Sequence, residues 1–372
     1  MTTSLPLFTA FSRAPSRLPL LGAGLALLLA GAAAQARPLG AQGDDFLYRV
    51  EPGDTLEALA RRYTRDPDNW RALQNVNRIA DPHQLPVAKV LRIPLALIPR
   101  LPARATVTYI HGSVTRDGKA LRVGDTLETG DVLRSGRGSA TLSLEDHSLL
   151  TIAPDSEVRI RNLQTFDGAG LTDTVLDLPR GSVESSVAPD DTGVGRFEIR
   201  TPATVTGVRG TQLRVHTGGS GSRHEVLHGE AAIRNPDQAE QRLAQAHGAA
   251  YDATGALLGV QTLLPAPTLR PLAPGASLLT WAPVPGAASY RVQVALDDGG
   301  TRLESSRLTA QSSAALAMTG TGLRYVFVRA IDALGIEGSD AMLSIRLLPG
   351  LASSDGSAVL DGSGAPIRVG GD

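Results

Sequence analysis

Three histidines lie close enough in the sequence to suggest a metal site. His224 and His228 are four residues apart, so on a β-strand they would share a face. His216 could lie across a hairpin from them, around the turn at residues 218–221. Three neutral imidazoles on one surface can bind a divalent metal. A polar hairpin surface accounts for the same spacing, and we favour it, so no metal site is predicted.

Residue types used by hydrolases also occur, in an order that does not suit catalysis. Asp146, His147 and Ser148 are consecutive, and adjacent residues in a turn cannot form a serine triad by themselves. Acidic residues are plentiful, but none stands in an unusual apolar setting of the kind that a glycosidase acid requires. The chain has no cysteine, which excludes thiol nucleophiles and thiolate metal sites. We therefore predict a protein that is not an enzyme, with no catalytic residue and no cofactor.

The overall composition describes a multidomain protein with many short strands. The chain has 372 residues, more than one ordinary domain requires, and its 40 glycines and 24 prolines favour turns over long helices. Its formal net charge is −1, which gives no electrostatic case for a nucleic-acid partner.

The first residues have the layout of a secretory signal peptide. A basic stretch without acids precedes an apolar run over residues 20–34, and Ala34-Gln35-Ala36 supplies the small residues that signal peptidase requires. We predict residues 1–36 as the signal peptide, cleaved after Ala36, and a periplasmic or cell-envelope location. The alternative is an uncleaved anchor.

Residues 46–95 alternate in a way that predicts strand, helix, helix and strand. Residues 46–50 read as a strand, and Asp54 is placed to cap a helix, with Glu57 completing a capping-box spacing. A second helix is expected to start near Asp66, and residues 90–94 to form a closing strand that stops at proline.

This segment resembles a LysM domain. The resemblance rests on residues 48–56 (YRVEPGDTL), on Asn77 and Ile79, and on residues 91–94 (LRIP). It implies a shallow groove for glycans that contain N-acetylglucosamine, which makes peptidoglycan the expected partner. Carried over position by position, the glycan-binding residues are Gly53, Asp54, Thr55, Leu56, Ile79, Ala80, Asp81 and Pro82. The family usually has glycine after the proline at 86, where this chain has Val87.

A proline-rich linker is expected at residues 96–103, followed by an almost purely β block at 104–235. Short alternating strands at near-regular spacing predict a sandwich or a rolled, solenoid-like sheet. This block resembles the FecR domain, on the basis of Gly124, residues 130–136, Asp146-His147-Ser148, residues 178–181, Thr201-Pro202 and residues 207–211. We interpret these motif residues as structural.

The FecR resemblance implies a periplasmic sensor or anti-sigma regulator. Such a role needs a cytoplasmic segment ahead of a membrane anchor, and only 19 residues precede the apolar run. We therefore favour a module that binds a partner over one that regulates a sigma factor.

The C-terminal third is expected to form another β-domain. Residues 236–267 are predicted as a bridge, with a helical turn within 238–247. Residues 268–348 resemble a fibronectin type III-like sandwich, with Trp281, Tyr290 and Tyr325 as core aromatics. Residues 349–372, rich in Gly, Ser and Asp, are predicted to be a disordered tail.

The predicted fold is therefore multidomain and mainly β: a small βααβ LysM module, a FecR-like sandwich or rolled sheet, and a fibronectin type III-like sandwich. Two functions remain open. The first is a peptidoglycan-bound scaffold that presents its β-domains to envelope or outer-membrane proteins. The second is a sensor that relays an envelope signal to a membrane partner.

Overall fold

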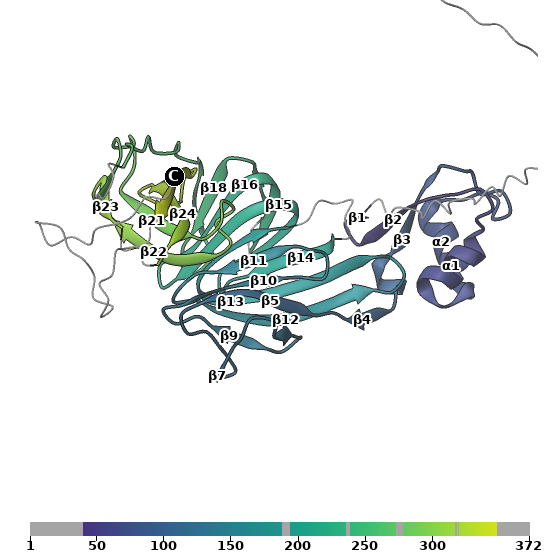
Figure 1. The fold of residues 1–372 in the computed structure, drawn as a ribbon. Coiled ribbons are helices and arrows are strands. Elements are labelled where there is room, and N and C mark those ends of the chain that lie inside the picture. The colour runs from purple at the N-terminus through teal and green to yellow at the C-terminus, as the bar shows by residue number, and fades with distance from the viewer. Residues whose placement is uncertain are drawn as a thin grey trace, which may run out of the picture. The chain divides into compact units, whose positions relative to one another are not determined.

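The computed structural model describes residues 40–187, 194–235, 239–272, 278–316, 318 and 320–347. All of these belong to one compact unit of the chain (Figure 1). The predicted signal peptide and the predicted tail lie outside the described residues. Within the described part, none of the helices combines the length and the apolar content needed to cross a bilayer.

The N-terminal module has the predicted βααβ order. Strands β1 (Ala41–Gln42), β2 (Asp45–Arg49) and β3 (Val90–Pro94) form a sheet in that order. Between β2 and β3 lie helix α1 (Leu56–Thr64), the 3₁₀ turn η1 (Pro67–Asn69) and helix α2 (Trp70–Asn77). Phe46, Tyr48 and Tyr63 pack ring against ring under the helices, at centroid distances of 5.1–6.4 Å.

Helix α1 starts one residue later than the sequence suggested. Thr55 is its N-cap, and the Thr55 hydroxyl accepts a hydrogen bond from the Ala58 N–H at 3.1 Å. Asp54 instead accepts hydrogen bonds from Tyr48 and Glu51 and fixes the preceding turn. The predicted Asp54 cap was therefore wrong, because a buried tyrosine hydroxyl in a neighbouring strand takes up the carboxylate.

The segment predicted as a linker is part of the folded body. It contains the 3₁₀ turn η2 (Leu95–Leu97) and strand β4 (Arg100–Pro102), which pairs antiparallel with β12 (Glu157–Phe166). Ile98 and Ala103 are buried. Prolines at 99 and 102 suit an edge strand, where a missing N–H costs no ladder bond, so a proline-rich stretch could look like a linker.

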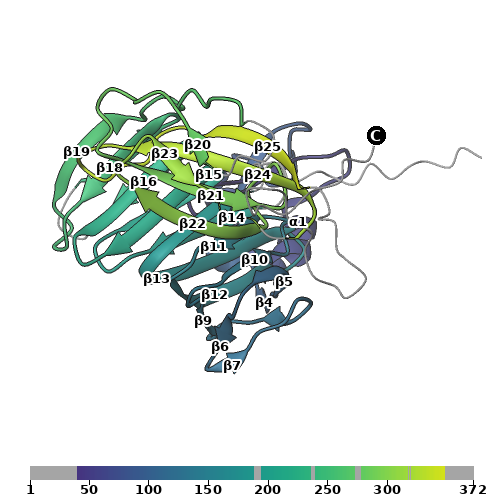
Figure 2. The same cartoon turned by 60° about the vertical axis from the view of Figure 1, so that its left-hand side comes forward.

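The next domain is one large sheet. Its sixteen described strands also include β5 (Ala105–His111), β6 (Thr115–Arg116), β7 (Lys119–Ala120), β8 (Thr126–Leu127), β9 (Val132–Arg134), β10 (Ser139–Ser143), β11 (Leu149–Ile152), β13 (Leu171–Ser186), β14 (Val194–Arg200), β15 (Val205–Gly218), β16 (Gly221–Arg234), β17 (Gln241–Ala244), β18 (His247–Tyr251) and β19 (Leu257–Thr262). The main path runs β19-β18-β16-β15-β14-β13-β11-β10-β5-β8, and Figure 2 shows it from β19 to β5.

Long strands bend this sheet around a single core. The first part of β13 pairs with β12 and β14, and its last part pairs with β11 and β15. The inward side chains of these strands, including Leu142, Phe197 and Leu213, form one apolar cluster. At Gly181, where β13 passes Ser156, an added Cβ would lie 2.4 Å from the Ser156 Cα, so only glycine fits.

The predicted bridge is a continuation of this sheet. β17 pairs with β16, β18 pairs with β16, and β19 pairs with β18. The helical turn expected within 238–247 is wrong for the described part, since residues 241–244 form β17. Pairing with β16, the preceding strand of the chain, sets the strand here instead of local helix propensity.

The C-terminal domain has two small sheets around its own core. One has the order β22 (Leu303–Thr309), β21 (Ser289–Ala295), β24 (Gly322–Ile331), β25 (Ala341–Leu347); the other pairs β20 (Leu278–Thr280) with β23 (Ser313–Ala315). Trp281 and Tyr290 are buried and meet edge to face at 5.3 Å, so their predicted core role is confirmed. Tyr325 is only half buried, because the neighbouring Val326 and Val328 point into the core instead.

Candidate functional site

The first loop of the predicted glycan groove is rigidly built. Gly53 is exposed and has φ +92°, a conformation that favours glycine. The Asp54 carboxylate accepts a hydrogen bond from the Tyr48 hydroxyl at 2.8 Å and one from the Glu51 N–H at 2.7 Å. Burial, followed by the hydrogen bond to Asp54, raises the pKa of Tyr48 well above its usual value of 10. Thr55 is exposed, whereas the Leu56 side chain is buried in the module.

The second predicted loop follows α2. The Ile79 N–H donates to the Gln74 carbonyl and the Ile79 carbonyl accepts from the Gln74 side chain, at 3.0 and 2.9 Å. The Ile79 side chain is buried. Ala80 and Asp81 are exposed, Pro82 is half buried, and Asp81 accepts a hydrogen bond from the His83 N–H. A glycan could therefore reach Ala80 and Asp81, but not the side chain of Ile79.

Replacing Asp54 by alanine is expected to destabilise the LysM module by about 1–3 kcal/mol, because the Tyr48 hydroxyl and the Glu51 N–H would both lose their acceptor. Amide hydrogen exchange in α1 and β2 measures this locally. Asp54→Asn retains an acceptor oxygen and should cost less. Equal protection in Asp54→Ala and the unmodified chain would contradict the prediction.

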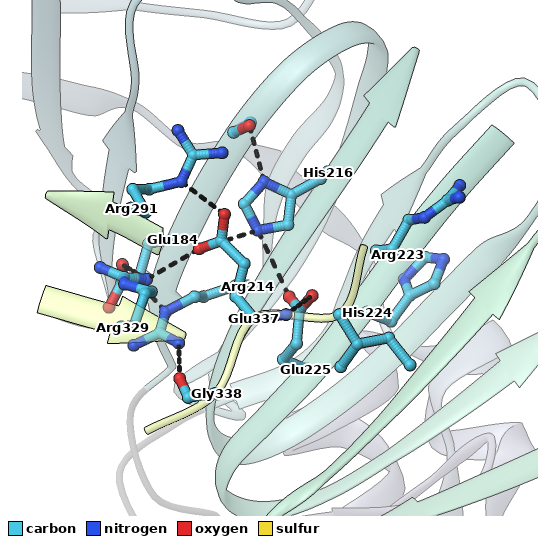
Figure 3. Close-up of polar contacts among 12 residues, drawn as sticks. Glu184, Arg214, His216, Arg223, His224, Glu225, Arg291, Arg329, Glu337 and Gly338 are labelled. Carbon is cyan, nitrogen blue, oxygen red and sulfur yellow. Dashed lines mark hydrogen bonds and ion pairs between the residues drawn. The ribbon is translucent and has the colours of Figure 1, made fainter. Parts of the chain in front are cut away.

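The three histidines do not assemble into one site. In the β15–β16 hairpin, His216 lies opposite Arg223, and the next pair is Val215 opposite His224. Because alternate residues of a strand point to opposite faces, His216 and His224 lie on different faces of the sheet (Figure 3). His228 lies beyond a bulge, opposite Gln212. Among the described residues, no group of His, Asp or Glu side chains is arranged to hold a metal ion.

The consecutive Asp146, His147 and Ser148 form the turn between β10 and β11. Asp146 accepts hydrogen bonds from the Ser148 N–H at 2.9 Å and from the Thr172 hydroxyl at 2.6 Å. His147 has φ +66° and is exposed, occupying the position where the family usually has glycine. The Asp146 carboxylate therefore fixes the turn and links it to β13.

A buried ionic cluster joins the large sheet to the C-terminal domain (Figure 3). We use the name interdomain cluster for its eight ionisable members, which are Glu184, Arg214, His216, Glu225, Arg291, Arg329, Glu337 and Asp340. Glu184, Arg214, His216 and Glu225 come from β13, β15 and β16. The others come from β21, β24 and the residues just before β25.

Arg329 and Glu337 lie at the centre of the interdomain cluster, and each is only 2% exposed. A guanidinium nitrogen of Arg329 hydrogen-bonds to Glu337 at 3.3 Å, and Glu337 also pairs with Arg291. Arg329 Nε is 2.8 Å from Asp340 Oδ1, but the angle does not make a hydrogen bond, so this contact is an ion pair only. Across the interface, Arg214 donates to the Gly338 carbonyl at 2.9 Å.

The pKa shifts in the interdomain cluster favour charged side chains. Burial by itself would raise the pKa of Glu337, but His216, Arg291 and Arg329 outweigh it and hold that pKa well below 4.5. Glu184 shows the same balance, with Arg214 and Arg329 lowering its pKa against burial. Burial would lower the pKa of Arg329, but Asp340 and Glu184 reverse that effect and raise it.

A cavity of about 20 Å³ lies inside the interface, lined by cluster residues together with uncharged polar residues such as Ser182 and Gln293 and apolar ones such as Val183 and Leu303. That volume suits one water molecule, which needs two to four polar partners. His216 Nε2 and Glu225 Oε2 are buried without a hydrogen bond, and they lie 3.4 Å apart.

Sequence reasoning missed the interdomain cluster. Its contacts across the interface join residues more than 100 positions apart, such as Arg214 with Asp340 and Glu225 with Glu337. The available signal was a charged residue inside an otherwise apolar strand, as at Arg329 between Val328 and Ala330. Such residues are rarely buried unless paired.

Comparisons with known proteins identify two domains. The LysM domain model matches residues 48–94, and the FecR protein model matches residues 125–232. No curated protein matches the chain. The fibronectin type III-like assignment of residues 268–348 is not tested by these matches and stays a prediction.

Solved structures show only distant likeness. A proposed anti-sigma factor from Parabacteroides distasonis is 14% identical, with a TM-score of 0.29, over 35% of this chain and 57% of that one. The chain thus spans just over half of that protein's length. The extracellular domain of a proposed hybrid two-component system from B. thetaiotaomicron is 8% identical, with a TM-score of 0.16, over 70% of this chain and 61% of that one.

LysM and FecR domains belong to binding and regulatory families and are typical of extracellular or envelope proteins. The described structure is mainly β, with its helices in the LysM segment, as expected. The chain is therefore a multidomain protein that contains a LysM domain followed by a FecR domain.

Proposed function

We propose that this protein is a non-enzymatic envelope scaffold, which binds peptidoglycan through its LysM domain and holds its β-domains in a fixed orientation to the wall. The observation that carries the proposal is the attachment of the LysM domain. Arg65 at the end of α1 donates two hydrogen bonds to Asp167 in the β12–β13 turn, one of them at 2.8 Å. The Gly168 backbone also approaches Arg62.

The chain between the domains adds to this attachment. The Leu95 N–H donates to the Asp44 carbonyl at 2.8 Å, Ile98 is buried, and β4 joins the large sheet. A module on a flexible tether serves to retain a protein at the wall, whereas a module fixed in this way also orients what it carries. Exposed Thr55, Ala80 and Asp81 remain open for N-acetylglucosamine-containing glycan.

Sedimentation with purified insoluble peptidoglycan tests the proposal. Residues 37–372 should sediment with the wall material, and Ala80→Trp should weaken binding roughly tenfold or more by filling the groove, a loss of about 1.4 kcal/mol. Arg61→Trp places the same indole on the exposed face of α1 and is the matched control. Point variants are preferable to deletion of residues 46–95, because the module contacts the sheet.

The FecR domain favours a second candidate, a sensor that relays an envelope signal to a membrane partner. In that case residues 37–372 would not sediment with peptidoglycan, and a membrane protein would be recovered with the uncleaved chain. The predicted groove would be contradicted if Ala80→Trp and Arg61→Trp reduced sedimentation with peptidoglycan equally.

A further inference from the structure

Strand β19 ends the large sheet, and among the described strands only β18 pairs with it. It is the terminal strand of the sheet path, and its inner side pairs with β18 (Figure 2). Five of its six residues are exposed. Leu257, Leu258 and Val260 are 39%, 49% and 37% exposed, on a strand whose sequence, LLGVQT, has no charge and no proline.

Other edges of this sheet carry the usual protection against edge-to-edge pairing. β8 has two residues, β7 has two residues and begins with Lys119, and β4 has three residues and ends in proline. β17 is short and contains Arg242. Short length, lysine or arginine and proline are the features by which proteins block edge pairing. Among these described edges, β19 is the long, uncharged and apolar exception.

The register shows which backbone groups of β19 are open. The Leu263 N–H donates to the Ala246 carbonyl of the neighbouring chain segment at 2.9 Å. Backbone groups alternate in direction along an antiparallel strand, and no bulge interrupts residues 260–263. The N–H and C=O groups of Gln261 therefore face β18, and those of Val260 and Thr262 face outward.

We propose that β19 pairs antiparallel with β19 of a second copy of this chain, with Val260 on the two-fold axis. In that register Val260 faces Val260 of the other copy, and Thr262 faces Leu258. The outward-facing backbone groups of Val260 then meet those of the second Val260, which an axis between two residues would not achieve, while Leu258 lies at the register shift of β19. An isologous contact of this kind closes as a dimer.

Self-pairing suits the composition of the strand. No like charges meet, because residues 257–262 carry none. Val260 lies opposite Ala249, which belongs to the main core, so pairing would extend the apolar layer across the axis. One six-residue edge is small for a stable interface, so we expect a weak, concentration-dependent dimer. Two linked LysM domains would then gain avidity on the wall.

Sedimentation velocity of residues 37–372 over a concentration series tests the dimer directly. Val260→Lys should weaken self-association at least about tenfold, because lysine on an edge strand opposes pairing. This variant changes only a side chain, so the backbone hydrogen bonds between β18 and β19 are kept. Leu308→Lys, at an exposed leucine of β22, is the matched control and should dimerise as the unmodified chain does.

The absence of native cysteine allows a second readout. Val260→Cys should form a disulfide-linked dimer on mild oxidation, since Cα atoms of an opposed pair are about 5.5 Å apart. Leu308→Cys should give far less. The proposal is overturned by a chain that stays monomeric throughout, by a dimer that Val260→Lys leaves intact, or by equal cross-linking of the two cysteine variants.

Discussion

Replacing Arg329 by methionine is expected to lower the free energy of unfolding by about 3–5 kcal/mol. Arg329 is buried among Glu184, Glu337 and Asp340, and it also donates to the Gln293 side chain. Methionine keeps much of the volume but removes the positive charge. The buried carboxylates would then lack a positively charged partner. The resulting loss of stability is much larger than the stability that an exposed ion pair contributes.

Denaturant unfolding measures this loss, with Arg161→Met as the control. Arg161 also pairs with an aspartate, Asp177, at 2.8 Å, but its side chain is 56% exposed, so its removal should cost at most about 1 kcal/mol. The double variant Arg329→Met with Glu337→Gln should lose less than the sum of the two single changes, since it removes two opposite charges together. Similar losses for Arg329→Met and Arg161→Met would contradict a central role for Arg329.

The LysM domain could be predicted closely because its signals are local. The turn at Gly53, the helix at 56–64 and the strand at 90–94 each depend on neighbouring residues, and β3 has the predicted bounds. The N-cap was misplaced by one residue because Asp54 and Thr55 are both good caps, and only the position of Tyr48 decides between them.

The rest depended on strand pairing, which sequence patterns do not reveal. Residues 96–103 and 236–262 looked like connections. Residues 100–102 pair with β12, far along the chain, whereas β17, β18 and β19 pair with strands close to them in the chain, in hairpins that the sequence pattern did not indicate. Tyr325 was assigned to the wrong face of β24 because residues 325–328 are all apolar or aromatic, and alternation cannot choose a face there. The interdomain cluster was hidden for the same reason, since its charges are paired only after the two domains meet.

Acid is expected to destabilise the protein between pH 6.5 and pH 3 mainly through His224. Its ring lies between β15 and β16 residues, bonded to the hydroxyls of Thr204 and Ser222 at 3.0 Å and of Thr206 at 2.9 Å. Burial, followed by the nearby His216 and Arg223, lowers the pKa of His224 from 6.5 to about 3. The folded state therefore keeps this imidazole neutral where the unfolded chain protonates it.

The sign of the effect follows from proton uptake. Below pH 6.5 the unfolded state binds a proton that the folded state excludes. The free energy of unfolding therefore decreases as the pH is lowered from 6.5, down to the pKa of His224 in the folded state. From pH 7 to pH 5 the loss should be about 2 kcal/mol. Glu337 and Glu184 also have lowered pKa values, but their stabilisation is lost only as pH falls below about 4.5, so the two windows overlap only there and the interval from pH 7 to pH 5 reports His224.

Denaturant unfolding at pH 7, 6 and 5 isolates His224. His224→Gln should be less stable at pH 7, because three hydroxyl contacts are disturbed, but its stability should change little down to pH 5. His83→Gln, on the exposed LysM surface, should retain the full slope of the unmodified chain. A His224→Gln slope equal to that of the unmodified chain would place the acid sensitivity elsewhere. A flat slope would show that proton uptake at His224 accounts for the loss of stability over this pH range.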